Sequence, residues 1–291
     1  MSPAPRRRDE PMDPMRDFGG GSEPLPLDQA HGLRRLFAAT RQRVLPLVSN
    51  PYVAFSGVVL DALSSRLAGR GHRVLVVDAG ESAQPPAELA RIDLAAGVED
   101  IAPGIAFLAA RGLPLEHVDP RGSAGGFLDA IADAAPEADI VLLHASAGDL
   151  ARVFSHRAAR PLLLAADDAE SVKHAYAGCK LLARRCRLLT FDLLLAGDPR
   201  RRRLAAIAAS LAGCADRFVG AVLRSWAVVD PAGDPLDAAG TADAALARLL
   251  DGQLRLQEPW PGSLPLDPRD APPFLPPAHP SARPNGPMPA R

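Results

Sequence analysis

Lysine is almost absent from this chain. Lys173 and Lys180 are its only lysines, so arginine supplies nearly all of the positive charge. The net charge is −1 and the pI is near 6.7, which gives no global electrostatic case for binding nucleic acid. Outside one short segment, the chain therefore has no lysine with which to hold a phosphate group.

Cysteine is also scarce, and long apolar runs are missing. The three cysteines, Cys179, Cys186 and Cys214, have neither the spacing of a metal site nor that of a disulfide framework, and we interpret them as thiols of a reducing cytosol. The first residues, MSPAPRRRDEPMD, lack the apolar stretch of a signal peptide, and no apolar run approaches the length of a membrane span. We therefore expect a cytoplasmic protein.

Proline and glycine are concentrated at the two ends. Residues 1–25 combine them with arginine and acid and predict a disordered arm, whereas residues 258–291 are rich in proline and predict an extended, mostly disordered tail. Residues 26–42 form a short separate segment. Residues 43–257 hold the folded domain, and a hydrophobic content of 47% lets the chain bury a large core.

Short apolar runs alternate with helical patterns between these ends. Several runs are continuous in Val, Ile and Leu, which is typical of strands covered on both faces. The predicted strands are Val44–Val48, Arg73–Asp78, Ile105–Leu108, Asp139–Ala145, Pro161–Ala165, Phe191–Ala196 and Val219–Arg224. The predicted helices between them are Gly57–Ala68, Gly126–Ala134, Asp149–Arg157, Ser171–Arg184 and Arg200–Leu211. The alternation predicts an α/β fold, a three-layer and mostly parallel sheet with helices on both faces.

The segment PLDQAHGLRRLF precedes the first predicted strand. Asp28 can cap a helix here, and Leu33, Leu36 and Phe37 share one face of it. Gly32 inside so short a helix costs about 1 kcal/mol relative to alanine. Periodicity alone favours a helix docked on the core, but the position after a disordered arm also lets the segment reach a partner.

The same segment resembles the DQAxGLR activator motif of the FlhG family, MinD-like ATPases that control flagellar number and placement. The matching residues are Asp28, Gln29, Ala30, Gly32, Leu33 and Arg34. Downstream, DDAESVKHAYAGCKLLAR is similar to the family's PEPTSxxDAYAxxK, RGHRVLVVDA to its second strand, and RFVGAVLRSWAVVDP to a late strand. The resemblance covers roughly residues 26 to 232 and implies the MinD/ParA-like P-loop NTPase fold.

The resemblance also implies partners. In the family, the activator helix binds the signal-recognition-type GTPase FlhF and stimulates GTP hydrolysis. Gln29 would then face the GTPase site, with Asp28 and Arg34 orienting the helix. Apolar contact would come from Leu33, Leu36 and Phe37. Flagellar switch-ring proteins are a further implied partner, and such partners would recruit the chain to the cell pole or inner membrane, with weak or indirect membrane contact of its own.

Counting back from Asp78 places the family's phosphate loop, S-G-K-G-G-V-G-K-T, on Val48–Ser56. Val53 and Ser56 are kept, but Asn50 and Phe55 stand where the two lysines belong. The loop Ser49–Ser56 has no glycine, since Pro51, Tyr52 and Ala54 replace glycines. A phosphate cradle needs inward N–H groups, close backbone approach and a lysine charge. Pro51 has no N–H, and Tyr52 and Phe55 are expected to fill the space of the phosphates.

Other positions of the family's nucleotide site have also changed. The second strand ends in Asp78-Ala79-Gly80 where the family has Asp-Ala-Asp, and His144 replaces the acid of a later strand, although Gly148 is kept. The proline-rich turn that contacts the base has become a stretch that contains Asp168. We interpret His144 as a hydrogen-bonded residue at a strand end, not as a catalytic base. The sequence thus predicts an abandoned nucleotide site, with the family's ATP and Mg²⁺ lost and no metal or other cofactor expected.

The last predicted helix is TADAALARLLDGQLRL. Its polar face mixes both charges, so we expect it to pack on the sheet and not to lie on a membrane. The leading hypothesis is a divergent FlhG-like regulator of flagellar assembly, a pseudo-ATPase that acts through its activator helix. Two alternatives stay open: an active MinD-like ATPase that switches with membrane binding, which would need the missing lysines, and a structural adaptor for polar or partitioning assembly.

Overall fold

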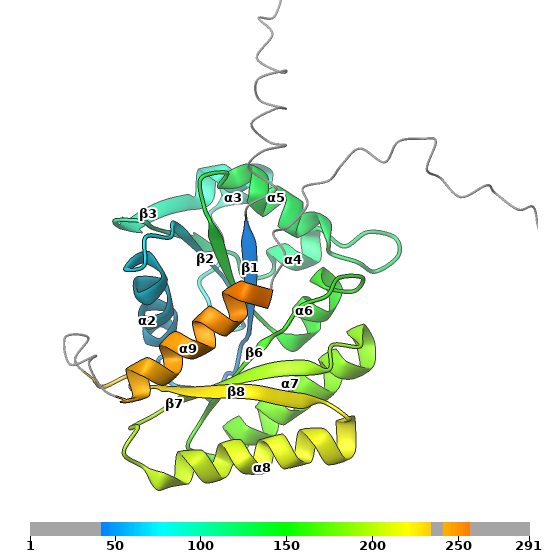
Figure 1. Cartoon of the computed structure of the whole chain (residues 1–291). Helices are drawn as coiled ribbons and strands as arrows, with labels where there is room; N and C mark the ends of the chain where they lie inside the picture. Colours follow the sequence, from blue (N-terminus) through cyan, green and yellow to red (C-terminus); the bar gives the residue numbers. More distant parts are fainter. Residues whose placement is uncertain (1–41, 234–240, 257–291) are drawn as a thin grey trace, which may run out of the picture.

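A sheet of eight strands runs through the part of the chain that the computed structural model describes, residues 42–233 and 241–256 (Figure 1). Its order is β3-β4-β2-β5-β1-β6-β7-β8, and every described pairing is parallel except that of β3 with β4. The strands are β1 Arg43–Val48, β2 Val74–Ala79, β3 Val98–Ala102, β4 Ile105–Ala109, β5 Ile140–Ala145, β6 Leu162–Ala166, β7 Thr190–Ala196 and β8 Val222–Val229.

Helices cover both faces of the sheet. They are α2 Ser56–Ala68, α3 Glu88–Ile92, α4 Leu113–Glu116, α5 Gly126–Ala134, α6 Ala147–Val153, α7 Ala169–Cys186, α8 Arg202–Val219 and α9 Thr241–Leu256, with a 3-10 turn at Leu94–Gly97. Side chains of α5 to α8 form one buried cluster with the sheet, and those of α2 and α9 form a second. The predicted three-layer, mostly parallel α/β fold is confirmed.

A proline shortens the pairing of the central strand β1. β1 pairs with β5 along its whole length, but with β6 only at Leu47 and Val48. Pro46 has no N–H to donate to a neighbouring strand, and pairing with β6 begins at the next residue. The chain leaving β1 at Val48 therefore emerges in the middle of the carboxyl edge of the sheet, between β5 and β6.

Two predictions about this sheet were wrong. The last strand was expected at Val219–Arg224, but Val219 ends α8, whose buried stripe continues past Leu211 to Ala215. The helix stops where Gly220 adopts the left-handed conformation, φ 68°, and the strand begins at Val222. Strand β3 was not predicted, because its sequence VEDIA lies at the sheet edge, is largely exposed and has no apolar run.

Helix α9 packs on the sheet, as the sequence predicts. Its apolar face is buried against α2 and the strands, and Leu246, Leu249, Leu250 and Leu254 form it. A buried polar cluster adds to this packing: Gln253 Nε2 donates to Asp192 Oδ2 at 2.8 Å, and Arg160 Nε lies 2.9 Å from the same oxygen. Gln253 also donates to the Arg160 carbonyl at 3.1 Å, so α9 is joined to the chain just before β6.

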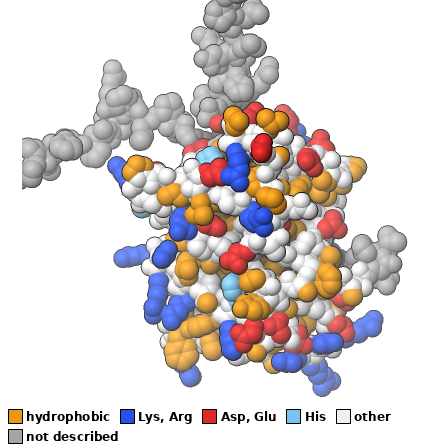
Figure 2. All heavy atoms as spheres, turned by 180° about the vertical axis from the view of Figure 1, so that it is seen from behind, with side chains coloured by type: hydrophobic (Ala, Val, Ile, Leu, Met, Phe, Trp, Pro, Cys, Tyr) orange, Lys and Arg blue, Asp and Glu red, His pale blue; other side chains and the backbone are white. Residues whose placement is uncertain are grey.

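The surface opposite α9 mixes side chains of all kinds. Basic and acidic groups are interspersed with apolar ones over this face, in keeping with the net charge of −1 (Figure 2). None of the described helices has both the length and the apolar character of a membrane span.

Candidate functional site

The loop between β1 and α2 occupies the predicted position of the phosphate loop. Ser49 and Asn50 are buried directly after β1, Val53 is buried in the middle of the loop, and Ser56 is the first residue of α2. Pro51, Tyr52, Ala54 and Phe55 are exposed. The sequence alignment of this loop with the strand and helix that flank it therefore agrees with the structure.

Asn50 is turned into the protein. Its side chain is 3% exposed, and its Nδ2 donates to the carbonyl of Leu164 at 2.8 Å and to that of Ser171 at 2.9 Å, with Ser171 Oγ at 3.1 Å. Ser171 Oγ in turn accepts the N–H of Ala166 at 2.8 Å. The residue in place of the signature lysine thus fastens the loop to the end of β6 and the first turn of α7, where no phosphate could reach it.

The N–H groups that follow Asn50 are used within the loop. Tyr52 N donates to Asn50 Oδ1 at 3.1 Å, and Val53 N donates to the Asn50 carbonyl at 3.0 Å. Pro51 has no N–H. None of the three residues after Asn50 can therefore direct an N–H toward an anion without breaking one of these bonds.

Phe55 and Tyr52 both lie at the surface of the loop. Phe55 is 72% exposed and Tyr52 is 52% exposed. Phe55 adopts the left-handed conformation (φ 62°, ψ 35°) at the start of α2, which turns its side chain outward while its carbonyl accepts the N–H of Val58 at 2.9 Å. The Tyr52 ring rests edge-on against His174 of α7, with 5.8 Å between ring centroids.

A second group of predicted site residues meets at the ends of β2 and β5. His144 is 2% exposed, and its Nδ1 lies 2.7 Å from Asp78 Oδ1, so the prediction of a hydrogen-bonded residue at a strand end is confirmed. His144 Nε2 is buried and has no hydrogen-bond partner among the described residues. A Cβ at Gly80 would lie 2.8 Å from His144 Cε1. The imidazole therefore occupies the space that an acid at position 80 would need.

Two further predicted site residues, Asp168 and Gly148, lie at the starts of helices. Asp168 caps α7, because its Oδ1 accepts the N–H of Ser171 at 2.8 Å. Gly148 lies in the first turn of α6, where its carbonyl accepts a bond from Arg152 at 3.2 Å. The structure thus forms two separate sets, Asp168 linked to Asn50 through Ser171, and His144 paired with Asp78. Ser171 was missed as part of the site, since only the folded chain brings it to Asn50.

The MinD/ParA-like fold implies ATP and Mg²⁺, and the arrangement of these residues does not fit them. No lysine enters the loop, the N–H groups of Tyr52 and Val53 are used internally, and Asn50 points inward. At the end of β5 the imidazole ring of His144 stands at the position of the family's acid, and an imidazole cannot hold Mg²⁺ through water as a carboxylate does. Among the described residues no cluster of three or more His, Cys, Asp or Glu has the geometry of a metal site.

The predicted activator residues cannot be placed. Asp28, Gln29, Ala30, Gly32, Leu33, Arg34, Leu36 and Phe37 all lie outside the described residues.

Neither a protein-family model nor a curated protein matches this chain. Among solved structures, it is similar to a plasmid partition protein from Borrelia burgdorferi, with TM-score 0.51 and 9% identity over 73% of this chain and 99% of that one. A structure described as a plasmid partition protein from Borrelia burgdorferi B31, bound to AMPPNP, gives TM-score 0.52 and 8% identity over 74% and 99%. The MinD cell division protein of Aquifex aeolicus gives TM-score 0.48 and 13% identity over 72% and 97%.

Identities this low show a shared fold and nothing about activity. The two partition proteins are matched over nearly their whole length. The chain has the MinD/ParA-like fold of P-loop NTPases.

Proposed function

We propose that this chain is an ATP-independent regulator built on a MinD/ParA-like fold, in which the nucleotide site is closed and the fold serves as a scaffold. The observation that carries the proposal is Asn50, which is buried and bonded to Leu164 and Ser171 at the position of the signature lysine. The pair of His144 and Asp78 supports it, because it fills the place of a second family acid. A triphosphate set against this loop would be an uncompensated charge.

The activity assigned to the chain comes from residues 26–42. Because this segment resembles the FlhG activator motif, the regulator controls flagellar number or placement by stimulating an FlhF-like GTPase. Stimulation of a partner requires one well-placed polar group and no active site in the stimulating protein. Gln29 is that group, with Leu33 in the apolar contact.

The test measures GTP hydrolysis by the cognate FlhF-like GTPase with added full-length chain. Gln29→Ala lowers the stimulated rate with little loss of binding if Gln29 acts on the transition state, whereas Leu33→Asp abolishes binding. Ser56→Ala, in the nucleotide loop, is the matched control and changes neither.

A chain that stimulates hydrolysis equally well with Gln29→Ala and Leu33→Asp would place the activity elsewhere. A chain that needs ATP to stimulate would overturn the ATP-independent part of the proposal.

A further inference from the structure

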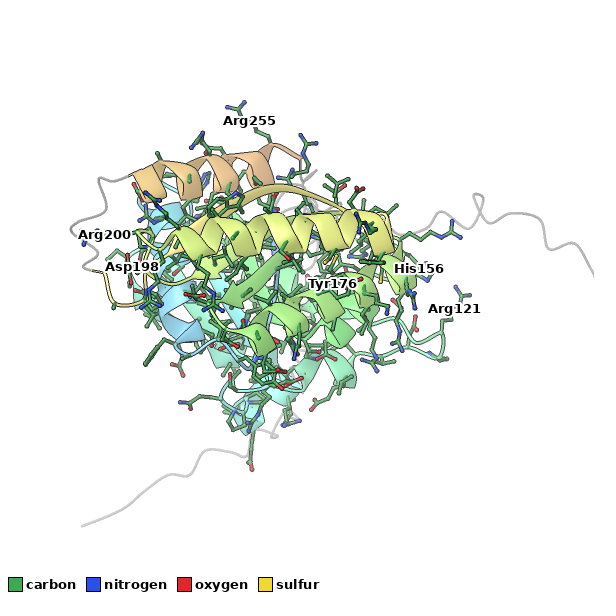
Figure 3. The ribbon with its side chains drawn as sticks, turned by 90° about the horizontal axis from the view of Figure 1, so that it is seen from below. Arg121, His156, Tyr176, Asp198, Arg200 and Arg255 are labelled. Atoms are coloured by element: carbon green, nitrogen blue, oxygen red, sulfur yellow. The ribbon has the colours of Figure 1, made fainter. Side chains whose placement is uncertain are left out.

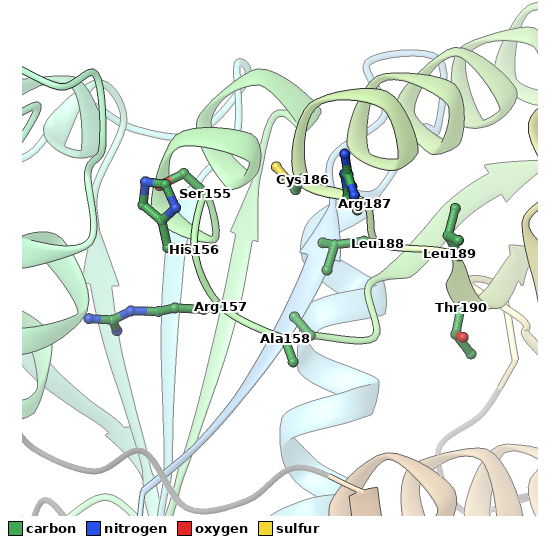
Figure 4. Close-up of a pocket in the computed structure, with 10 residues that line it drawn as sticks. Ser155, His156, Arg157, Ala158, Cys186, Arg187, Leu188, Leu189 and Thr190 are labelled. Carbon is green, nitrogen blue, oxygen red and sulfur yellow. The ribbon is translucent and has the colours of Figure 1, made fainter.

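A cavity opens at the amino ends of β6 and β7, far from the loop described above. Its volume is about 460 Å³, within the range of about 300–1,000 Å³ that ligand pockets span. It lies between Ser155–Ala159, which precedes β6, and Cys186–Thr190, which runs from the last residue of α7 to the first residue of β7 (Figure 4). In Figure 3, His156 at this cavity lies at the opposite end of the molecule from Asp198 and Arg200, which follow β7.

The cavity has an apolar floor and a basic rim. Leu188 is buried at its base, and Leu189 is 47% exposed at its mouth. The apolar surface continues onto β8, where Val222 is 53% exposed and donates its N–H to the Leu189 carbonyl at 2.8 Å. His156, Arg157 and Arg187 are the ionisable lining residues besides Cys186, and none of the lining residues is acidic. Arg157 already pairs with Asp129 of α5 at 4.0 Å, so His156 and Arg187 supply the charge of the rim. The cavity therefore suits an apolar chain segment that carries negative charge.

The last turn of helix α9 lies close to the residues that line this cavity. Gln253 donates to the carbonyl of Arg160, the residue next to Ala159 of the lining, and to Asp192, two residues beyond Thr190. Leu256 ends α9 less than one helical turn later. An extended proline-rich chain advances about 3.1 Å per residue, so four such residues would carry Trp260 about 12 Å beyond Leu256.

We propose that residues 257–268, QEPWPGSLPLDP, fold back over the amino edge and occupy this cavity, with Trp260 against Leu188 and Leu189. The segment supplies apolar side chains and two acids, Glu258 and Asp267, and has no basic residue to oppose the rim. Its prolines reduce the entropy lost on docking. The tether holds the segment at an effective concentration of about millimolar, which favours it over a second copy or another protein. This inference does not depend on the proposed GTPase partner.

Trp260 reports on its own docking, because the chain has only two tryptophans. In a full-length chain with Trp226→Phe, Trp260 emits at shorter wavelength and is quenched less by acrylamide than in a free peptide of residues 255–270. Leu189→Glu in the same background places negative charge at the cavity mouth and returns both readings to those of the peptide. Leu115→Glu, at a residue 50% exposed on α4, is the matched control and leaves them unchanged.

Reversing the charge of one cavity residue, Arg187, provides an independent test. Arg187 has φ 56°, a conformation that Asp tolerates, so Arg187→Asp tests the basic rim even if Leu189→Glu fails to fold. It shifts the emission toward that of the peptide.

Three results would overturn the proposal. They are a Trp260 as exposed in the chain as in the peptide, a protection unchanged by both cavity variants, and a protection that grows with protein concentration. The last would show that a second copy supplies the segment.

Discussion

The two edges of the sheet differ in how their polar groups are satisfied. At the carboxyl ends of β1 and β5, buried side chains bond to one another or to the backbone, with Asn50 on Leu164 and Ser171 and with His144 on Asp78. At the amino ends of β6 and β7 the described residues instead line a cavity with an apolar floor and a basic rim, for which we propose residues 257–268 as the occupant. Open α/β sheets bind ligands outside the carboxyl ends of their strands. In this chain buried side chains at that edge bond to the protein itself, and the described cavity lies at the other edge.

Turning Asn50 from donor to acceptor gives the largest expected effect. Asn50→Asp keeps the size of the side chain but sets a carboxylate against the carbonyl oxygens of Leu164 and Ser171. We expect the free energy of unfolding to fall by about 3 kcal/mol, because two buried hydrogen bonds are lost and a charge is left without a partner. Urea denaturation measures this.

Ser56→Ala is the control for Asn50→Asp, and its unfolding free energy should stay within about 0.5 kcal/mol of the wild type. An Asn50→Asp chain as stable as this control would show that Asn50 does not hold the carboxyl edge closed.

A side chain added at Gly80 tests the packing of the His144–Asp78 pair. A Cβ there would meet His144 Cε1 at 2.8 Å, His144 Nδ1 at 3.0 Å and Asp78 Oδ1 at 3.2 Å. Because the ring is buried and cannot swing aside, Gly80→Ala should cost about 1–3 kcal/mol of unfolding free energy. In a His144→Ala background the cost should nearly vanish, and a double-mutant cycle by urea denaturation measures that coupling. Additive losses would mean that the ring and position 80 do not compete for space.

The sequence predicts features set by residues close together in the chain. The bonds of Asn50 and of His144 instead join residues that are far apart in the chain. Continuous apolar runs located every parallel strand to within a few residues except β8, and the leucine stripe predicted α9 and its packing. The loop position followed from its distance to Asp78. In contrast, Asn50 and Ser171 stand 121 positions apart, and only the folded sheet brings β6 and α7 to the loop.

The backbone conformation of single residues could not be predicted from the sequence either. The sequence offers a phenylalanine at position 55 as bulk for the phosphate space, but the left-handed backbone at Phe55 carries the ring outward. Strand β3 has no apolar signal because it lies exposed at the sheet edge, where pairing with β4 alone defines it. Register and backbone torsion are properties of the assembled sheet.

The reactivities of two cysteines compare the middle of α7, at Cys179, with its last residue, Cys186. Burial raises the pKa of Cys179 to about 12, and burial also raises that of Cys186, which is half-buried and lines the cavity. A raised pKa leaves little thiolate at pH 8, so both thiols should react more slowly than free cysteine and faster as the pH rises.

In a Cys214→Ser chain at pH 8, a thiol reagent should modify Cys186 before Cys179, as followed by mass spectrometry. In urea the two should react alike. Equal rates in the folded chain would contradict the deeper burial of Cys179.

The smallest expected effect is that of ATP on the carboxyl edge, which should be zero. A micromolar site in the presence of millimolar ATP and Mg²⁺ would stabilise the folded chain by about 4 kcal/mol, since binding to the native state adds RT ln(1 + [L]/Kd). For a domain of this size that corresponds to a rise in Tm of at least about 8 °C. We expect no shift, because the loop would have to break the bonds of Asn50, Tyr52 and Val53 before it could face a phosphate. Differential scanning fluorimetry with and without ATP measures it, with Ser56→Ala as the control. A rise in the Tm of the wild type that Ser56→Ala abolishes would show a working nucleotide site. The carboxyl ends of the strands would then bind a ligand, as they do in other open α/β sheets.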